Sequence, residues 1–137
     1  MKPSSIVIIT LLMAATAGSI NGQEIVKVGK ATYFTKESCI REGNSGITAS
    51  GKPLDDSKLW CALPRDIMNA LNLKFEQIIK VTNTDTRRHA YVKLMDIGPG
   101  KKARSRGVVI DLTLTTFLQL NGSTNRGHIN VSWQTVK

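Results

Sequence analysis

The chain has 137 residues, of which 41% are hydrophobic and 21% charged, and its 19 Lys and Arg exceed its 10 Asp and Glu to give a formal net charge of +9. This length and apolar content allow one domain with a modest core, and the charge favours anionic partners. The first apolar run, residues 6–17, is shorter than the roughly 20 residues that a bilayer-spanning helix needs.

The N-terminus has the pattern of a secretory signal peptide. Lys2 precedes the apolar run, and Ala15-Thr16-Ala17 matches a cleavage site. No Cys follows that would carry a bacterial lipid anchor, and no later run is apolar enough to span a membrane. We therefore predict a secreted or periplasmic protein with a signal peptide at 1–17, a short leader at 18–28 and one domain at 29–137. Export disfavours nucleic acid as a partner, and we expect a monomer.

The remaining pattern predicts a mainly β domain with two short helices. Segments with β-branched, aromatic or alternating apolar residues predict strands at 29–34, 59–63, 77–81, 89–95, 108–112 and 127–133. Two further segments predict helices at 66–72, after Pro64, and at 114–120, with Thr113 as N-cap and Asn121-Gly122 as stop. Residues 36–46, which are mostly polar and contain two glycines, are predicted to form a loop, and so is the basic segment after Gly100.

Alternation along residues 89–95 places Ala90, Val92 and Leu94 on one face of a strand, with Tyr91, Lys93 and Met95 on the other. The predicted elements also repeat weakly at an offset of 49 residues, and the matched pairs are Leu63 with Leu112, Met68 with Phe117, Leu71 with Leu120 and Asn72 with Asn121. Two similar strand–helix–strand units in one small domain favour a pseudo-symmetric closed barrel.

The chain contains two cysteines, Cys39 and Cys61. An even number in an exported chain favours a disulfide between them. The alternative is a nucleophilic pair of one Cys with His89 or His128 as base, although nothing in the sequence brings either His near a Cys. The ligand spacing of a zinc site is absent, so we predict no metal.

Two predicted strands end in carboxylates, Asp96 and Asp111. Catalytic and binding groups concentrate where strands lead into loops, because a rigid scaffold holds them within reach of solvent. We therefore expect Asp96 and Asp111 to face each other across a cleft. The intervening segment carries four cations, which we predict to contact substrate: Lys101, Lys102, Arg104 and Arg106.

Short motifs occur here in the order seen in double-psi β-barrels. They are Gly29-x-Ala-Thr-Tyr33, Thr48-Ala-Ser-Gly51, Ala62-Leu-Pro64, Val81-Thr-Asn83, Asp96-x-Gly-Pro99 and Val109-Ile-Asp111-Leu112. The set most resembles the rare-lipoprotein-A-like barrels, with expansins and family-45 endoglucanases as more distant relatives, and covers nearly all of the mature chain. The resemblance implies a six-stranded double-psi β-barrel with a polysaccharide groove across one face.

The resemblance also implies a reaction, because some rare-lipoprotein-A-like proteins are lytic transglycosylases of peptidoglycan. One well-placed acid suffices for that chemistry, since the muramic acid supplies its own nucleophile. Matching motifs make Asp111 and Asp96 the catalytic candidates and imply no cofactor. Residues expected to bind cell-wall polysaccharide, whether anionic or neutral, are Thr32, Tyr33, Thr48, Ser50, Trp60 and Tyr91 together with the four cations.

The sequence departs from the lytic members at two places and so leaves other functions open. Lys52 stands where they carry Glu, and Trp60-Cys61 occupies the region of their His. One alternative is a non-catalytic, expansin-like module that binds or loosens the wall. Another is a secreted protein-binding barrel, such as a protease inhibitor or defence protein, with residues 36–45 as its candidate loop. Asn121 and Asn130 begin glycosylation acceptor sequences.

Overall fold

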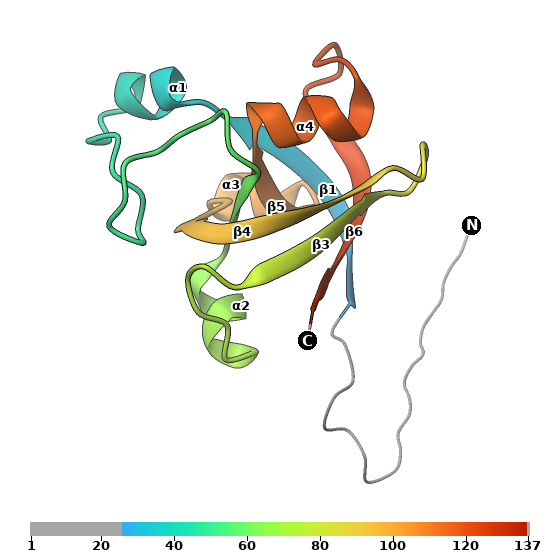
Figure 1. The fold of residues 1–137 in the computed structure, drawn as a ribbon, viewed down its shortest axis with the longest axis horizontal. Coiled ribbons are helices and arrows are strands. Elements are labelled where there is room, and N and C mark those ends of the chain that lie inside the picture. The colour runs from blue at the N-terminus through green and yellow to red at the C-terminus, as the bar shows by residue number, and fades with distance from the viewer. Residues whose placement is uncertain (1–25, 137) are drawn as a thin grey trace, which may run out of the picture.

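Six strands close into a barrel in the computed structural model, which describes residues 26–136 (Figure 1). The strands are β1 (Val26–Phe34), β2 (Trp60–Leu63), β3 (Ile78–Asn83), β4 (His89–Ile97), β5 (Val108–Thr113) and β6 (Ile129–Thr135). Their order around the barrel is β1-β5-β2-β4-β3-β6. The pairs β1–β5 and β2–β4 are parallel and the other four antiparallel. The predicted mainly β, six-stranded barrel with short helices is confirmed.

The structure has four short helices where the sequence predicted two. They are α1 (Lys36–Arg41), α2 (Arg65–Ala70), α3 (Lys101–Ser105) and α4 (Leu114–Asn121). The predicted loops at 36–46 and after Gly100 were therefore wrong in part. At α1, Thr35 and Ser38 form a capping box, in which each side chain accepts the backbone N–H of the other residue. This short-range pairing stabilises a helix in a polar segment that has no apolar periodicity.

Strand order and sequence repeat describe the same pseudo-two-fold symmetry. Exchanging β1 with β4, β2 with β5 and β3 with β6 leaves the order around the barrel unchanged. The offset of 49 residues carries β2 onto β5, and it carries Ala62 onto Asp111. These two residues are also directly opposite each other in the antiparallel β2–β5 pair, so the pseudo-axis passes between them. The predicted pseudo-symmetric barrel is thus confirmed.

The core fills the barrel interior, and α4 covers one end of it (Figure 1). Trp133, Phe117 and Leu120 are fully buried there. Met95 is buried as well, although it lies on the face opposite to Leu94 in the predicted alternation. The turn at 48–51 lies against this part of β4, because the Ser50 N–H donates to the Met95 carbonyl oxygen at 3.1 Å.

The cap of α4 differs from the prediction. Thr113 occupies the N-cap position, yet its side chain makes no capping bond. Its hydroxyl instead donates to the Lys58 carbonyl oxygen at 2.6 Å and lies 2.8 Å from the Thr116 hydroxyl. At the other end, Gly122 is left-handed at φ 81° and its N–H donates to Leu118, which confirms the predicted stop.

β1 includes Val26, Lys27 and Val28, which were predicted to lie in the leader. The predicted signal peptide and most of the leader lie outside the described residues. Within residues 26–136, no helix has the length and apolar character needed to cross a bilayer.

Candidate functional site

Asp96 and Asp111 lie on the two neighbours of β2, on either side of Ala62. Ala62 pairs with Asp96 in the parallel β2–β4 ladder and with Asp111 in the antiparallel β2–β5 ladder. Adjacent strands are about 4.8 Å apart, which separates the two aspartate Cα atoms by about 10 Å. The small Ala62 side chain leaves the space between the two carboxylates open. Both aspartates line one cavity, which is described below.

Asp111 is a half-buried carboxyl with one close partner. In the parallel β1–β5 ladder it pairs with Thr32, whose hydroxyl donates to Asp111 Oδ1. Burial raises the pKa of Asp111, the Thr32 hydrogen bond opposes the rise, and the negative charges of Asp96 and Glu42 add to it. A Cβ at Gly98 would lie 3.0 Å from Asp111 Oδ2, so the glycine allows the backbone to approach. The site therefore holds a proton on Asp111 more tightly than water does.

Asp96 has a different environment, in which its carboxylate holds a turn. Oδ1 accepts the backbone N–H groups of Ala49 and Ile97, each at 2.9 Å. The Ala49 bond attaches the turn at 48–51 to the end of β4. Within residues 26–136, Asp96 Oδ2 has no hydrogen-bond partner, and Asp96 also lines the cavity described next. Asp96 therefore combines a structural bond with one oxygen available to a ligand.

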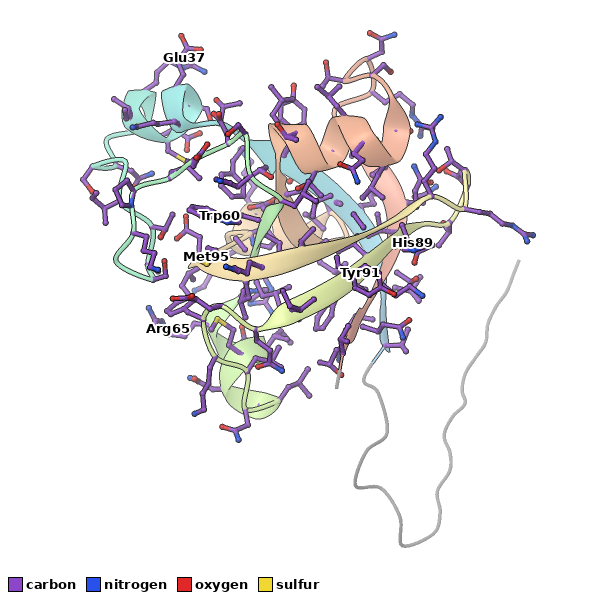
Figure 2. The ribbon with its side chains drawn as sticks, viewed as in Figure 1. Glu37, Trp60, Arg65, His89, Tyr91 and Met95 are labelled. Carbon is purple, nitrogen blue, oxygen red and sulfur yellow. The ribbon has the colours of Figure 1, made fainter. Side chains whose placement is uncertain are left out.

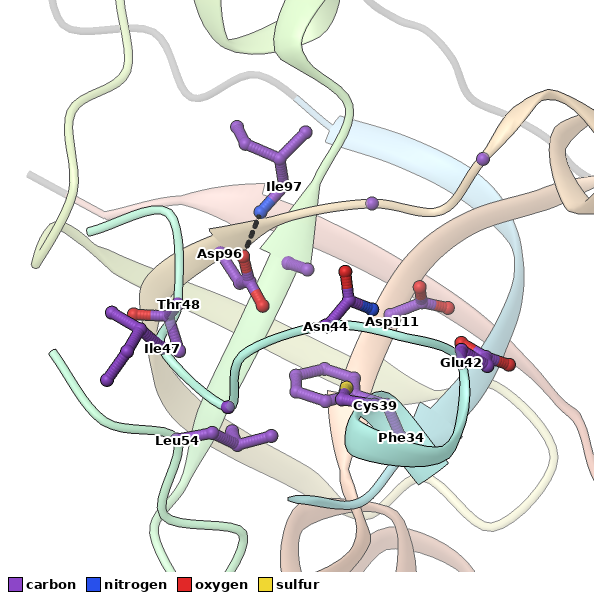
Figure 3. Close-up of a pocket in the computed structure, with 14 residues that line it drawn as sticks. Phe34, Cys39, Glu42, Asn44, Ile47, Thr48, Leu54, Asp96, Ile97 and Asp111 are labelled. Carbon is purple, nitrogen blue, oxygen red and sulfur yellow. Dashed lines mark hydrogen bonds between the residues drawn. The ribbon is translucent and has the colours of Figure 1, made fainter. Parts of the chain in front are cut away.

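Both aspartates line a cavity of about 240 Å³ between α1, the following loop and the ends of β2, β4 and β5. Figure 3 shows Asp96, Asp111 and Glu42 around it, with Asn44 between the two aspartates in this view. The other walls are apolar or small and come from Phe34, Cys39, Gly46, Ile47, Thr48, Leu54, Ala62, Ile97, Gly98 and Gly100. Three acidic side chains line this cavity and no Lys, Arg or His does. It is a local acidic site on a basic protein.

The predicted disulfide is absent, since Cys39 and Cys61 are both free. Successive side chains of a strand point to opposite faces. Ala62 lines the cavity beside Cys39, whereas Cys61 points into the core. Burial raises the pKa of both thiols, and Asp96 contributes at Cys39. The alternative Cys/His pair has no support, because no His lines the cavity that Cys39 borders.

Four of the predicted sugar-contacting residues lie away from the cavity. Tyr33 packs against Phe117, with ring centroids 4.9 Å apart, and borders a separate open hollow of about 540 Å³ beside α1 and α4. Tyr91 lies on the outer face of β4, and Trp60 is half-buried on β2 (Figure 2). Ser50 supports the turn, with its hydroxyl 2.6 Å from that of Thr48. Only Thr48 lines the cavity, and Thr32 reaches it through Asp111.

The predicted cations Lys101, Lys102 and Arg104 lie on α3 and Arg106 directly follows it; all four are exposed. Gly100, at the N-cap of this helix, lines the cavity, but none of the four side chains does. Arg104 instead forms a two-pronged ion pair with Asp66, with N–O distances of 2.9 and 3.0 Å. This pair joins α3 to α2.

Lys52, at the position of the lytic members' Glu, does not line the cavity either. Its Nζ lies 3.3 Å from Glu76 Oε2, and the two side chains are 57% and 50% exposed. Sequence reasoning did not place Phe34, Cys39, Glu42 or Asn44 at the cavity that they line. A usable signal existed only for Phe34, which follows the Gly29–Tyr33 motif. The other three come from α1 and the loop after it, where the sequence carries no periodicity.

The described residues contain no group of three or more His, Cys, Asp or Glu side chains that could hold a metal ion. The three carboxylates around the cavity can instead accept hydrogen bonds from hydroxyl groups, and protonated Asp111 can donate one.

No family model matches the sequence, and no curated protein is similar enough to match it. Solved structures do match. The Streptomyces papain inhibitor has 25% sequence identity and a TM-score of 0.59, over 85% of this chain and 96% of the inhibitor. An expansin of Clavibacter michiganensis has 21% identity and a TM-score of 0.60 over 82% of this chain. An aspartate-to-asparagine mutant of that expansin, in complex with cellohexaose, has 20% identity and a TM-score of 0.60. The chain spans about half the length of the expansin. By its fold, this chain is an expansin-like and papain-inhibitor-like barrel, consistent with the double-psi β-barrel family.

Proposed function

We propose that this protein is a secreted, non-catalytic module that binds a neutral cell-wall polysaccharide in the acidic cavity. The observation that carries the proposal is the composition of that cavity, where Glu42, Asp96 and Asp111 surround a space without any cation. Sugar hydroxyls donate hydrogen bonds, and carboxylate oxygens accept them. Anionic polymers, in contrast, would be repelled by three carboxylates.

The cavity also offers apolar contact beside these acceptors. Phe34, Ile47 and Leu54 line it from the loop side. An apolar wall beside a few convergent polar groups is the usual composition of a ligand site. The expansin match supports a polysaccharide as ligand, because one of the matched expansin structures is a complex with cellohexaose. Cellohexaose is uncharged, in agreement with the acidity of the cavity.

Two features favour binding over cleavage. The Asp96 carboxylate is fixed by two backbone N–H groups, and Lys52 is ion-paired with Glu76 away from the cavity. Of the two predicted catalytic carboxylates, Asp111 is then the one that a lytic reaction would use, by protonating the leaving oxygen. If the protein has the lytic activity that the family resemblance implies, it should release soluble products from its polymer, and the variant Asp111→Asn should release none.

The test incubates the mature chain with insoluble cellulose, chitin and purified bacterial sacculi. Retained protein is measured by sedimentation, and soluble products by mass spectrometry. We expect retention on a neutral polymer without soluble products, and loss of retention in Asp111→Asn. The matched control is Asp85→Asn, which removes an exposed carboxylate of the β3–β4 turn outside the cavity and should leave binding unchanged.

Each other outcome would overturn part of the proposal. Soluble anhydro-sugar or reducing-end products that are lost in Asp111→Asn would establish cleavage. An equal loss of retention in both variants would show that net charge, not the cavity, controls binding. Retention on none of the polymers would exclude a glycan of these classes. N-terminal sequencing of protein recovered from the medium tests export, and we expect a start near Gly18.

A second candidate function is inhibition of a papain-like cysteine protease. The match to the papain inhibitor covers 96% of that protein at 25% identity. In this chain, the segment between β1 and β2 exposes Ile40 and Ile47, with 51% and 52% of their surface accessible. We expect any inhibition of papain to fall in Ile47→Ser and to persist in Asp111→Asn. No inhibition of papain by the native chain would remove this candidate.

A further inference from the structure

The barrel has a second surface with chemistry opposite to that of the cavity. Strands β1, β6, β3 and β4 are consecutive around the barrel, and no helix lies over the front of β3 and β4 in Figure 1. We call the outward side chains of these strands the basic sheet face. By strand alternation they are Val26, Val28, Lys30, Asn130, Ser132, Gln134, Ile78, Lys80, Thr82, His89, Tyr91 and Lys93.

The charge of the basic sheet face has one sign. Lys30, Lys80 and Lys93 lie on it, and none of its twelve side chains is acidic. One carboxylate outside the face contacts it: Asp85, in the β3–β4 turn, accepts a hydrogen bond from Asn130 Nδ2 at 3.2 Å. Asp85 therefore lies at the rim. The lysines make no ion pair within the described part of the chain.

Tyr91 lies among the polar groups of this face. It is directly opposite Lys80 in the β3–β4 ladder, and the Lys80 Nζ lies 6.0 Å from the ring centroid. The His89 ring meets it edge-on at 5.6 Å (Figure 2). Half of the Tyr91 surface remains accessible. An aromatic ring that is held by its neighbours but still exposed provides contact area at low entropic cost.

We propose that the basic sheet face binds an anionic polysaccharide whose sugars carry carboxylate groups. Lysine ammonium groups would neutralise the carboxylates, and the Thr82 and Ser132 hydroxyls would bond sugar hydroxyls. The Tyr91 ring would contact the apolar side of a sugar. The acidic cavity and the basic sheet face would thus bind two different wall polymers.

The composition of the face favours a uronic-acid polymer over nucleic acid. Arginine, whose planar fork suits phosphate best, is absent from the twelve side chains, while polar hydroxyl and amide side chains are frequent. Lysine acts as a point charge, which a single carboxylate per sugar can satisfy. Lys80 and Lys93 lie on the adjacent strands β3 and β4 beside Tyr91, whereas Lys30 lies on β1, on the other side of β6.

Affinity electrophoresis through gels containing polygalacturonate tests the proposal. The full mature chain should be retarded, and fully methyl-esterified polygalacturonate should not retard it. Lys80→Gln/Lys93→Gln should weaken the binding by about tenfold, since exposed ion pairs contribute modestly. Tyr91→Ala should weaken it without changing the net charge.

The matched control is Lys36→Gln/Lys58→Gln. Both lysines are exposed and lie near Asp55, so the pair removes two clustered charges outside the basic sheet face. The control should keep the native retardation. Asp111→Asn should also keep it, because the cavity is a separate site, so failure of the cavity proposal and failure of this one are distinguishable. Circular dichroism of each variant verifies that it is folded.

Three results would overturn the inference. One is a control that loses as much retardation as Lys80→Gln/Lys93→Gln, because net charge alone would then explain binding. Another is equal retardation by the methyl-esterified polymer, which has no carboxylates to pair. The third is binding of single-stranded poly(A) as tight as that of polygalacturonate at the same ionic strength, which would indicate an unselective polyanion surface.

Discussion

Thr32→Val is the sharpest test of the site, because it removes one hydroxyl and keeps the shape of the side chain. In the native protein that hydroxyl donates to Asp111 Oδ1, and the partner is half-buried. A hydrogen bond to an ionised group contributes about 1.5–3 kcal/mol, whereas one between neutral groups contributes about 0.5–1.5 kcal/mol. We therefore expect Thr32→Val to lower the free energy of unfolding by about 1.5–3 kcal/mol at neutral pH, and by about half as much in acid.

The pH dependence follows from the pKa of Asp111, which burial raises above its ordinary value of 3.8. The folded state binds this proton more tightly than the unfolded chain does, so stability falls as the pH rises through the folded pKa. The Thr32 hydroxyl opposes that rise in pKa. Without it the pKa rises further, and the variant loses more stability than the native protein between acid and neutral pH. Below 3.8 the carboxyl is protonated in both states and this difference vanishes.

Urea unfolding monitored by circular dichroism measures both free energies, at about pH 3 and at pH 7. The double variant Thr32→Val/Asp111→Asn serves as control, because it carries no ionisable group at this site. Its stability relative to Asp111→Asn should not change with pH. An equal loss in the single variant at both pH values would refute the reasoning, since the hydroxyl would then not be stabilising an ionised Asp111.

Three further predictions concern other residues. Asp96→Ala should cost about 2 kcal/mol in urea unfolding, since two backbone N–H groups lose their acceptor, and Asp96→Asn should cost less because its carbonyl oxygen can still accept. A thiol reagent in denaturant should react with two free thiols, and a reductant should leave the melting temperature unchanged. If no thiol reacts, Cys39 and Cys61 form the disulfide that the sequence predicted. Expression in a eukaryotic secretory host should give a glycan, seen by mass spectrometry, at the exposed Asn130 and not at Asn121, which is half-buried and uses both Oδ1 and Nδ2 in hydrogen bonds, to Asn83 and Ser123. A glycan at Asn121 would contradict that assignment.

The barrel was predictable because its strands alternate clearly and its ordered motifs are specific. Alternation along β4 put Ala90, Val92 and Leu94 inside, and all three are buried. The position of Asp111 in the second half of β5 followed from the apolar run at 108–112. The burial of Met95 did not follow from alternation. The turn at 48–51, which is remote in sequence, bonds to its backbone and is held there by Asp96.

Half of the cavity wall was not predictable for a related reason. Glu42 and Asn44 belong to α1 and its loop, which have no hydrophobic period and whose position depends on tertiary contacts. One of these contacts is the hydrogen bond that the Lys36 N–H donates to Asp56 Oδ2, with an N–O distance of 2.8 Å. The disulfide prediction failed because it rested on the number of cysteines and took no account of strand faces. Cys61 points into the core, whereas its neighbour Ala62 points toward Cys39.

The pseudo-two-fold axis between Ala62 and Asp111 has a consequence for any ligand that lies across it. Symmetry would place Asp111 equivalent to Ala62, and Thr32 equivalent to Asp96, because the two parallel ladders pair these residues in the same way. An unbroken symmetry would give both halves of the cavity the same groups. The sequence breaks it, with a protonatable carboxyl and a hydroxyl in one half and a methyl group and a fixed carboxylate in the other. A polysaccharide has chemically different ends, so its two orientations across this axis would meet different partners, and the cavity can distinguish the direction of the chain.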